Sequence, residues 1–493
     1  MPVYRSSCRA RAHVTSLIDL GVLAEYVPAS LVGEVVAQCG RQEKRVRALP
    51  AVVMVYFMLA LGLFSGQGYR EVLRKITAHL GPVIESGGYR IAGSSALARA
   101  RRRLGTEPLR CLFGRLCGPL AGPDVPGAYA FGRRLVLASM DGTVLDVPET
   151  TANVAAFGPP PRAGGAYGGG VAGYPQVRLL TLIACGTRAI IAAAFGPRKL
   201  SEHELARRLC ACGQIGPGML VLADRNFRGY PLISQFRGLG ADLIWRASAR
   251  LILPVLAEFA DGSYQSVIPE PREGRRCAMA RHRGKPITRL PRGIPVRVVE
   301  AQITLAPAHG RPRTESYRLL TTLDAATAPA QAIARTYAER WESETGYREL
   351  KAFLRNGQHV LRSKTPQGIE QEIYALLTTH QVIQSVRADA ARHAGGHPAD
   401  PDRISYTITL RALTRRITQR PTATPTTQAT PRLSAIHEIL TSQLPARRHR
   451  SYPRGLKNRN ARRQAIQATP PGTMTYTITI RKPQGQPHPT SDP

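Results

Sequence analysis

The sequence predicts a protein of the α/β class with an all-helical N-terminal domain. Helical patterns of apolar and basic side chains fill the first part of the chain, and strands then alternate with a capped helix up to about residue 227. From about residue 235 to 328 the pattern is strand-like and broken by prolines, which indicates a β-rich insertion. We therefore expect three domains, at 1–125, 126–400 and 401–493.

The charge of the chain indicates a polyanionic partner. Lys and Arg number 68 against 33 acids, which gives a net charge of +35. A basic excess spread along a whole chain, without a lipidation signal, favours nucleic acid over a membrane surface. The 8 cysteines show neither zinc-site nor disulfide spacing, so we expect reduced thiols in a cytoplasmic protein.

Two N-terminal segments predict helices in different surroundings. The apolar run at 49–64 is 16 residues long, shorter than the roughly 18–20 residues of a membrane-spanning helix, so we expect a buried core helix. Residues 94–105 can be capped by a serine and carry several arginines: Arg99, Arg101, Arg102 and Arg103. This basic helix indicates a DNA-binding unit of the helix-turn-helix type. The alternative is a solvated arginine face on a helical bundle.

Two aspartates follow apolar strand patterns. Asp141 lies in the segment 134–147 and Asp224 in the segment 218–227, and we expect each at the end of its strand, on the rim of a sheet. Between them the sequence predicts a hairpin and then a helix that begins with a capping box at Ser201.

Three other segments predict little regular structure. The Gly- and Pro-rich segment 158–175 does not join a strand to a helix, so we expect a mobile loop rather than a phosphate-binding one. After residue 400 the acids nearly vanish, with 16 Lys and Arg against 2 acids from residue 403 onward. Residues 420–432 resemble a Thr/Pro linker, and residues 447–463 a basic arm.

The segment "YAERWESETGYRELK" at 337–351 predicts one charged helix. At 100° per residue four positions share one face within roughly 60°: Tyr337, Arg340, Glu344 and Lys351. Two further cations point the same way, Arg348 and Arg355, while the other acids point to the far side: Glu339, Glu342 and Glu349. One acid on a basic, aromatic stripe suits a face that meets phosphates, although surface ion pairs are the alternative. For Trp341 we expect packing in the core rather than stacking on DNA.

Together, Asp141, Asp224 and Glu344 supply the carboxylates of a candidate two-metal site. Hard oxygen ligands can hold two Mg²⁺ ions roughly 3.5–4 Å apart, where they activate a water or 3′ hydroxyl and stabilise the leaving oxygen. A lone aspartate at the end of a strand is usually a turn residue. The three acids together, with the basic stripe around the third, favour a catalytic site.

These motifs resemble those of DDE transposases of the insertion sequence 4 family. The family signature of Tyr, Arg, Glu and Lys with gaps of two, three and six residues is matched by Tyr337, Arg340, Glu344 and Lys351. The "MDGT" at Asp141 and the "ADRNF" at Asp224 are similar to the segments around the family's two aspartates. The N-terminal "YREVLRKI" and "ARARRRLG" resemble a helical domain of these transposases, so the resemblance spans nearly the whole chain.

The resemblance implies an RNase H-like core, a mixed sheet flanked by helices, that binds two Mg²⁺ ions, with Mn²⁺ as a substitute. It implies a homodimer that cleaves the inverted-repeat ends of its own element through a hairpin and joins them to target DNA. Asp141, Asp224 and Glu344 would be the catalytic metal ligands. Four side chains would bind DNA phosphates beside them: Tyr337, Arg340, Lys351 and Arg348. We expect a cytoplasmic, nucleoid-associated bacterial protein without a membrane partner.

Two other functions remain open at this point, because a fold alone does not determine function. One is a structure-selective nuclease with an RNase H-like core, which would have no need of separate end-recognition and arm domains. The other is an inactive, domesticated DNA-binding protein. Loss of an acid would support the second, and all three acids are present.

Overall fold

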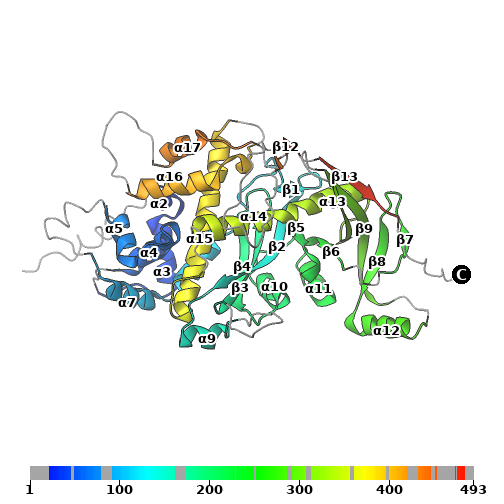
Figure 1. Cartoon of the computed structure of the whole chain (residues 1–493), viewed down its shortest axis with the longest axis horizontal. Helices are drawn as coiled ribbons and strands as arrows, with labels where there is room; N and C mark the ends of the chain where they lie inside the picture. The colour runs from blue at the N-terminus through cyan, green and yellow to red at the C-terminus, as the bar shows by residue number, and fades with distance from the viewer. Residues whose placement is uncertain are drawn as a thin grey trace, which may run out of the picture.

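The computed structural model describes most of the chain in one body (Figure 1). The residues described are 21–45, 49–78, 91–160, 173–227, 229–248, 251, 253–285, 291–306, 312–355, 360–395, 399–418, 431–445, 450–451, 472–473 and 475–482. Most of the loop 158–175, the Thr/Pro segment 420–430 and nearly all of the basic arm 447–463 lie outside these residues.

The N-terminal part is helical, as the sequence predicted. Its helices are α2 (Val22–Tyr26), α3 (Ala29–Gln38), α4 (Ala51–Leu63), α5 (Tyr69–Ile76), α7 (Ser94–Leu104) and α8 (Glu107–Leu116). The apolar run forms α4, which is buried along nearly its whole length, so the prediction of a core helix is confirmed. Among the described residues no helix is long and apolar enough to cross a membrane.

A long helix, α15 (Pro366–His393), joins the helical part to the sheet (Figure 1). It packs against α4 and α8, and two helices from beyond residue 400 pack against it in turn, α16 (Tyr406–Thr418) and α17 (Pro431–Leu440). The core of this helical body continues onto the face of the sheet, where Leu145, Val177 and Leu179 belong to it. Residues 401–440 therefore fold with the N-terminal helices rather than as a separate basic region.

The centre of the molecule is a mixed sheet with the order β4-β3-β2-β5-β6-β10-β9-β8-β7. The first five strands are β2 (Leu135–Asp146), β3 (Gln176–Ala184), β4 (Ile190–Pro197), β5 (Met219–Ala223) and β6 (Asp242–Arg246). The pairs β2–β3 and β3–β4 are antiparallel, while β2–β5 and β5–β6 are parallel. The short strand β1 (Tyr129–Ala130) pairs with β2. This is the predicted RNase H-like arrangement.

Helices cover both faces of the mixed sheet. On one face α10 (Glu202–Cys210) and α11 (Tyr230–Gly238) enclose an apolar core around Trp245. On the other, α13 (Ala330–Tyr337) packs over the strands β5, β6 and β9. A short helix, α9 (Thr151–Phe157), follows β2, and a 3₁₀ turn, η3 (Arg225–Phe227), follows β5. The predicted cap at Ser201 is confirmed, since its side chain accepts the N–H of Glu204 at 3.1 Å, while the Glu204 carboxylate accepts from Arg207.

The β-rich insertion extends the core sheet instead of forming a second one. Its strands are β7 (Ala257–Glu258), β8 (Tyr264–Pro269), β9 (Gly293–Ala306) and β10 (Arg313–Thr321), and β10 pairs antiparallel with β6. The insertion also carries a helix that the strand-like pattern did not predict, α12 (Pro271–His282). From the far end of the chain, β13 (Thr475–Ile480) adds to β9. A small ladder of β11 (Arg450–Ser451) and β12 (Gly472–Thr473) and a 3₁₀ turn, η6 (Pro401–Arg403), complete the elements.

The prediction of one uniform α-helix at 337–351 is wrong. After α13 the chain makes a 3₁₀ segment, η4 (Ala338–Trp341), then the α-helix α14 (Glu342–Arg348), then a π-helical segment, η5 (Glu349–Leu354). A 3₁₀-helix turns about 120° per residue instead of 100°, so four such residues rotate Tyr337 by roughly 80° relative to Glu344. The shared face predicted for the four signature residues therefore does not form.

Candidate active site

The register of two parallel strands brings Asp141 and Asp224 together. The ladder between β2 and β5 ends with Met140 opposite Ala223, so each aspartate is the next residue on its own strand. Asp224 follows the end of β5, as predicted. Asp141, by contrast, lies in the middle of β2, because its pairing with β3 continues as far as Asp146. The pairing of β2 with β5 ends one residue before Asp141, so the Asp141 side chain still lies at an open rim of the sheet.

The Asp141 carboxylate is held in a partly buried position. Its Oδ1 accepts the N–H of Gly142 at 2.8 Å, and the buried Tyr347 hydroxyl donates to its backbone carbonyl at 2.5 Å. The pKa of Asp141 is raised to about 6, chiefly by burial and also by the charges of Asp224 and Glu344, against the lowering effect of the Gly142 N–H and of Arg340. The three predicted acids therefore lie close enough to repel one another.

Arg340 lies between the first and the third acid. Its Nη1 is 3.8 Å from Asp141 Oδ2, and its Nη2 donates to Glu344 Oε1 at 3.2 Å. The Arg340 side chain is only 12% exposed, whereas that of Glu344 is 47% exposed. The guanidinium therefore neutralises the acids from the protein side and leaves Glu344 open to solvent.

The other predicted DNA-contact residues differ in accessibility. Arg348 is exposed and Lys351 is half-buried. Burial lowers the pKa of Lys351, as does the neighbouring charge of Arg355, while Asp146 raises it. Tyr337 is 4% exposed, and its hydroxyl donates to the carbonyl of Ala223 at 3.4 Å. The Tyr337 ring supports the strand that leads to Asp224 and is not on the surface.

Trp341 is where the sequence interpretation was wrong. We expected it in the core, but it is 45% exposed, with the Arg340 guanidinium 5.0 Å from its ring centre. The 3₁₀ segment turns it outward beside Arg340. An exposed indole next to the acids is a surface on which a base could stack.

A buried ion network lies under the segment that carries Glu344. Arg188, in the turn between β3 and β4, donates from Nε to Glu342 at 2.9 Å and from Nη1 to Glu349 at 2.8 Å. Its Nη2 donates to Asp402. All four residues are at most 4% exposed. Two of the three acids that we expected on the far side of the helix, Glu342 and Glu349, thus form its buried side.

Charge pairing keeps this network ionised. Burial by itself would lower the pKa of Arg188, and the carboxylates of Glu349 and Asp402 raise it instead. Burial would likewise raise the pKa of Glu349, but Arg188 and Arg387 lower it. From α15, Gln384 and Arg387 also donate to Glu349, at 2.8 and 3.4 Å. The network therefore ties α14, the β3–β4 turn and α15 to one another.

Sequence reasoning missed Arg188, Tyr347 and a further acid, Glu202. The Glu202 side chain is half-buried, and burial raises its pKa, with Arg178 lowering it and Asp224 raising it. It is the first residue of a helix whose cap at Ser201 was predicted, but its nearness to Asp224 depends on how α10 packs on the sheet. For Arg188 the only available signal was a cation in the turn of an apolar hairpin.

No metal cluster is preformed among the described residues, since no three His, Cys, Asp or Glu side chains stand close enough to hold an ion. The donor set nevertheless fits a divalent cation, because carboxylate oxygens are the ligands that Mg²⁺ prefers. The mutual repulsion that raises the pKa of Asp141 would be relieved by a cation. Asp141, Asp224 and Glu344 are the residues that would hold it.

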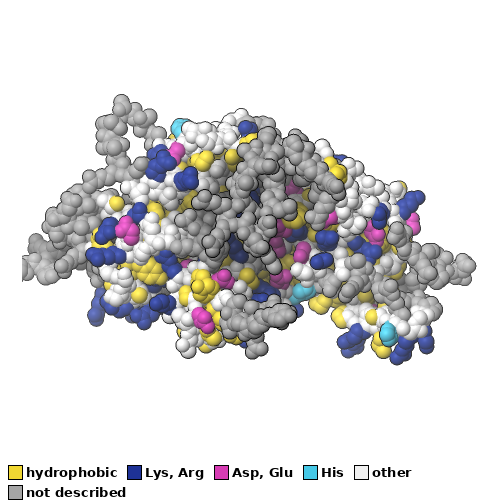
Figure 2. Space-filling model, in the orientation of Figure 1, with side chains coloured by type: hydrophobic (Ala, Val, Ile, Leu, Met, Phe, Trp, Pro, Cys, Tyr) yellow, Lys and Arg dark blue, Asp and Glu magenta, His cyan; other side chains and the backbone are white. Residues whose placement is uncertain are grey.

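Acidic and basic side chains are distributed unevenly over the face that carries the acids. Figure 2 shows acidic side chains near the middle of one face, over the region of β2, β5 and α10 in Figure 1. Basic side chains gather at the two ends of this face, over α7 and α12. Exposed cations of these two helices include Arg99, Arg102, Arg103, Arg272 and Arg275. Arg101, by contrast, is 6% exposed and donates to Ser363 and Gly368, so it does not belong to the predicted basic surface.

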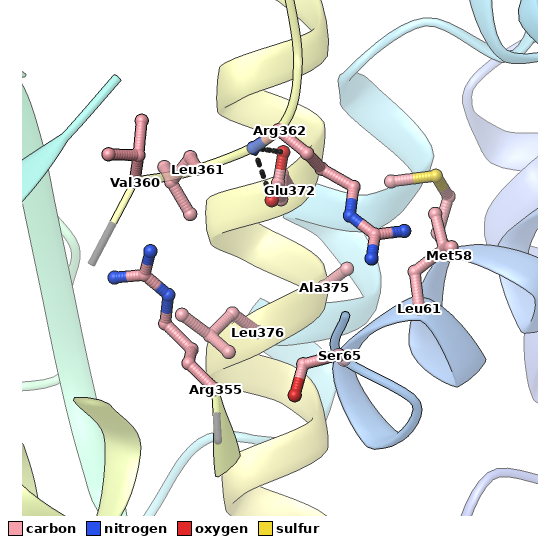
Figure 3. A pocket seen from close by; sticks show the side chains of 11 residues that line it. Met58, Leu61, Ser65, Arg355, Val360, Leu361, Arg362, Glu372, Ala375 and Leu376 are labelled. Carbon is pink, nitrogen blue, oxygen red and sulfur yellow. Dashed lines mark hydrogen bonds between the residues drawn. The ribbon is translucent and has the colours of Figure 1, made fainter. Parts of the chain in front are cut away.

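A small cavity of about 30 Å³ lies away from the acids, between α4, α15 and the segment after the π-helix. Figure 3 shows the Arg362 backbone nitrogen bonded to Glu372, with the Arg362 guanidinium on the side of Met58. Arg355 is 6% exposed, and its Nη2 has no partner among the described residues. A volume of this size holds about one or two waters. The cavity therefore belongs to the junction of the helical body and the core.

The chain is similar to known transposases. A family described as "Transposase DDE domain" matches residues 133–381, about half of the chain, and one described as "Insertion element 4 transposase N-terminal" matches residues 17–114. The transposase InsG for insertion sequence element IS4 of Escherichia coli (strain K12) is 26% identical over 443 residues, covering 89% of this chain and 92% of that protein. A cryo-EM structure of the piggyBac transposase synaptic complex with hairpin DNA is similar with a TM-score of 0.37 and 10% identity, over 86% of each chain.

The first prediction concerns the buried network. Arg188→Met leaves three buried carboxylates with too few cations, so the free energy of unfolding should fall by about 3–5 kcal/mol. Denaturant unfolding followed by circular dichroism measures this. Arg207→Met is the matched control, since the Arg207–Glu204 pair at 2.8 Å is exposed, and its loss should stay below about 1 kcal/mol. Equal losses for the two variants would show that the buried network stabilises the fold no more than an exposed ion pair does.

The second prediction concerns the Asp141 carboxyl in protein freed of metal by a chelator. Its pKa is raised from 3.8 to about 6, so the folded state binds the proton more tightly than the unfolded state does. The resulting stability is fully present below pH 3.8 and is lost as the pH rises through about 6. Asp141→Asn cannot ionise and should be more stable than the wild type at pH 7, with a smaller difference at pH 4. Melting temperatures across this range test the sign, and a constant difference would contradict it.

Proposed function

Because this chain belongs to the insertion sequence 4 family of DDE transposases, we propose that it cleaves the ends of an insertion sequence by two-metal phosphoryl transfer and joins them to target DNA. It binds the inverted-repeat ends, opens them through a hairpin on the transposon end, and acts as a homodimer in the complex that pairs the two ends. The N-terminal match at residues 17–114 favours this function over a structure-selective nuclease.

The observation that carries the proposal is the nearness of the three acids, two of which are bridged by Arg340. Asp141 and Asp224 follow paired positions of parallel strands, and Arg340 links Asp141 to Glu344. Two divalent ions, when bound, would activate the attacking oxygen and stabilise the leaving one. The side chains themselves hold the ions, and Arg340 is placed to attract a phosphate as soon as the ions neutralise the acids.

Contacts to DNA are proposed around the same rim. Arg348 is exposed and Lys351 half-buried on the segment that follows Glu344, and each can hold a phosphate near the acids. Trp341, at 45% exposure, offers a face for a base. Tyr337 acts from beneath, by supporting the end of β5. The exposed arginines of α7 and α12 extend the basic surface outward on either side of the acids, as end recognition requires.

The third prediction tests the acids. Asp141→Ala, Asp224→Ala and Glu344→Ala should each abolish cleavage of end DNA while leaving end binding largely intact, because each removes a metal ligand and no basic group. Cleavage assays on labelled end duplexes and gel-shift measurements check the two halves. Asp146→Ala is the control, since the Asp146 carboxylate accepts Gln176 Nε2 at 2.8 Å away from the rim. Normal cleavage by one of the three acid variants would remove that residue from the site.

The fourth prediction concerns Lys351. Lys is a point charge that positions a phosphate, so Lys351→Ala should slow hairpin resolution or strand joining more than it changes the Mg²⁺ dependence. Lys351→Arg should restore part of the rate. Single-turnover assays at several Mg²⁺ concentrations separate the effects. A raised Mg²⁺ requirement with normal handling of DNA ends would contradict the assignment.

A further inference from the structure

A fourth carboxylate, that of Glu202, lies against the first acid's strand. Glu202 opens α10, and a methyl group built at Gly142, the residue after Asp141, would lie 2.6 Å from its Oε1. The Glu202 carboxylate therefore occupies the space above the backbone of Gly142. A side chain at position 142 would collide with the Glu202 carboxylate in this position, whereas glycine does not.

The surroundings of this carboxylate are those of the active site. Burial raises the pKa of Glu202, the charge of Arg178 lowers it, and the charge of Asp224 raises it. No hydrogen bond or ion pair to the Glu202 carboxylate is found among the described residues. The half-buried Glu202 carboxylate therefore lies beside the residue that follows Asp141, without a partner among the described residues.

We propose that Glu202 is a fourth carboxylate of the active site, and that it binds a divalent cation together with Asp141 and Asp224. The proposal rests on the metal-dependent chemistry proposed above and adds a ligand to it. Hard cations such as Mg²⁺ and Mn²⁺ take carboxylate oxygens. A carboxylate that touches the residue next to Asp141, and that senses the charge of Asp224, is placed to supply one.

The ordinary role of an acid in this position is to stabilise the helix. A glutamate in the first turn interacts favourably with the helix dipole, and α10 has two such acids, Glu202 and Glu204. Glu204 provides the matched comparison. It lies on the same first turn but is directed to solvent, where it pairs with Arg207 at 2.8 Å. If Glu202 only stabilised the helix, substituting Glu202 or Glu204 would have the same effect. If Glu202 binds a cation, only its substitution weakens cation binding.

Gly142 allows the position of the carboxylate to be tested without removing it. In Gly142→Ala the new methyl group would press on the end of a flexible side chain, which can move, so the protein should fold while the Glu202 carboxylate is displaced. Gly142→Ala should therefore reproduce the effect of Glu202→Gln. The double variant should show no larger effect than either single variant, because both act through one carboxylate.

The experiment measures Mn²⁺ binding to the full-length protein by electron paramagnetic resonance, without DNA or turnover. Glu202→Gln and Gly142→Ala should each weaken Mn²⁺ binding about 10-fold or more, the loss typical of a group that supports a metal site. Glu204→Gln should bind Mn²⁺ as the wild type does. Circular dichroism confirms that each variant is folded, and Glu202→Gln stands as the test by itself if Gly142→Ala fails to fold.

Two outcomes separate the inference from the proposed function. If Asp141→Asn and Asp224→Asn lose Mn²⁺ binding while Glu202→Gln keeps it, Glu202 is not a ligand and the two-metal site stands. If the two aspartate variants also keep wild-type Mn²⁺ binding, the metal site itself is misplaced and the proposed chemistry fails with it. Equal weakening by Glu202→Gln and Glu204→Gln would assign the effect to the helix and overturn the inference.

Discussion

The position of Glu344 depends on one buried cation, Arg188. Its guanidinium faces three carboxylates from two separate parts of the chain, and its own backbone has a φ of 57°, a left-handed conformation unusual for a residue other than glycine. A buried charge is tolerated only with partners in good geometry. Glu342 and Glu349 bracket Glu344 on the chain, so the β3–β4 turn fixes both sides of the segment that presents the third acid. Small displacements of this segment would separate charges that have no access to water.

The irregular helix around Glu344 follows from the same constraint. The 3₁₀ segment before α14 and the π-helical segment after it change the rotation per residue on either side of the acid. As a result, Tyr337 turns inward under β5, Glu342 and Glu349 reach Arg188, and Arg340 and Glu344 face Asp141. In a straight α-helix these side chains would point away from their partners. Irregular turns of this kind are common at functional sites because they aim side chains that a regular helix cannot.

Much of the catalytic core was predictable from local patterns. The apolar strands before Asp141 and Asp224, the helix cap at Ser201 and the buried α4 all follow from periodicity and capping chemistry, which act over a few residues. The burial of Tyr337 and the exposure of Trp341 were not predictable, since they depend on a change of helix type. Nor was the link of Arg188 to Glu342, which are 154 positions apart. In α16, Thr409, Leu413 and Ile417 repeat every four residues on its buried side, but the basic composition of the C-terminal region obscured that helical signal.

Side chains of α15 fix the position of the helical body relative to the central sheet. Gln371 donates to the carbonyls of Arg101 and Gly105 at 2.8 Å, while Gln381 accepts the N–H of Ile190, at the start of β4, and donates to Leu116 and Gly118. The bonds of Gln371 and the bond from Ile190 to Gln381 are buried, so exchanging them for bonds to water would cost free energy. The exposed arginines of α7, which we propose as a DNA contact, are therefore held at a fixed distance from the acids, because α7 is bonded through α15 to the sheet that carries Asp141. In the proposed function, recognition of DNA and its cleavage would both depend on this connection, which ends at Arg188 and Gln381 on the side of the sheet.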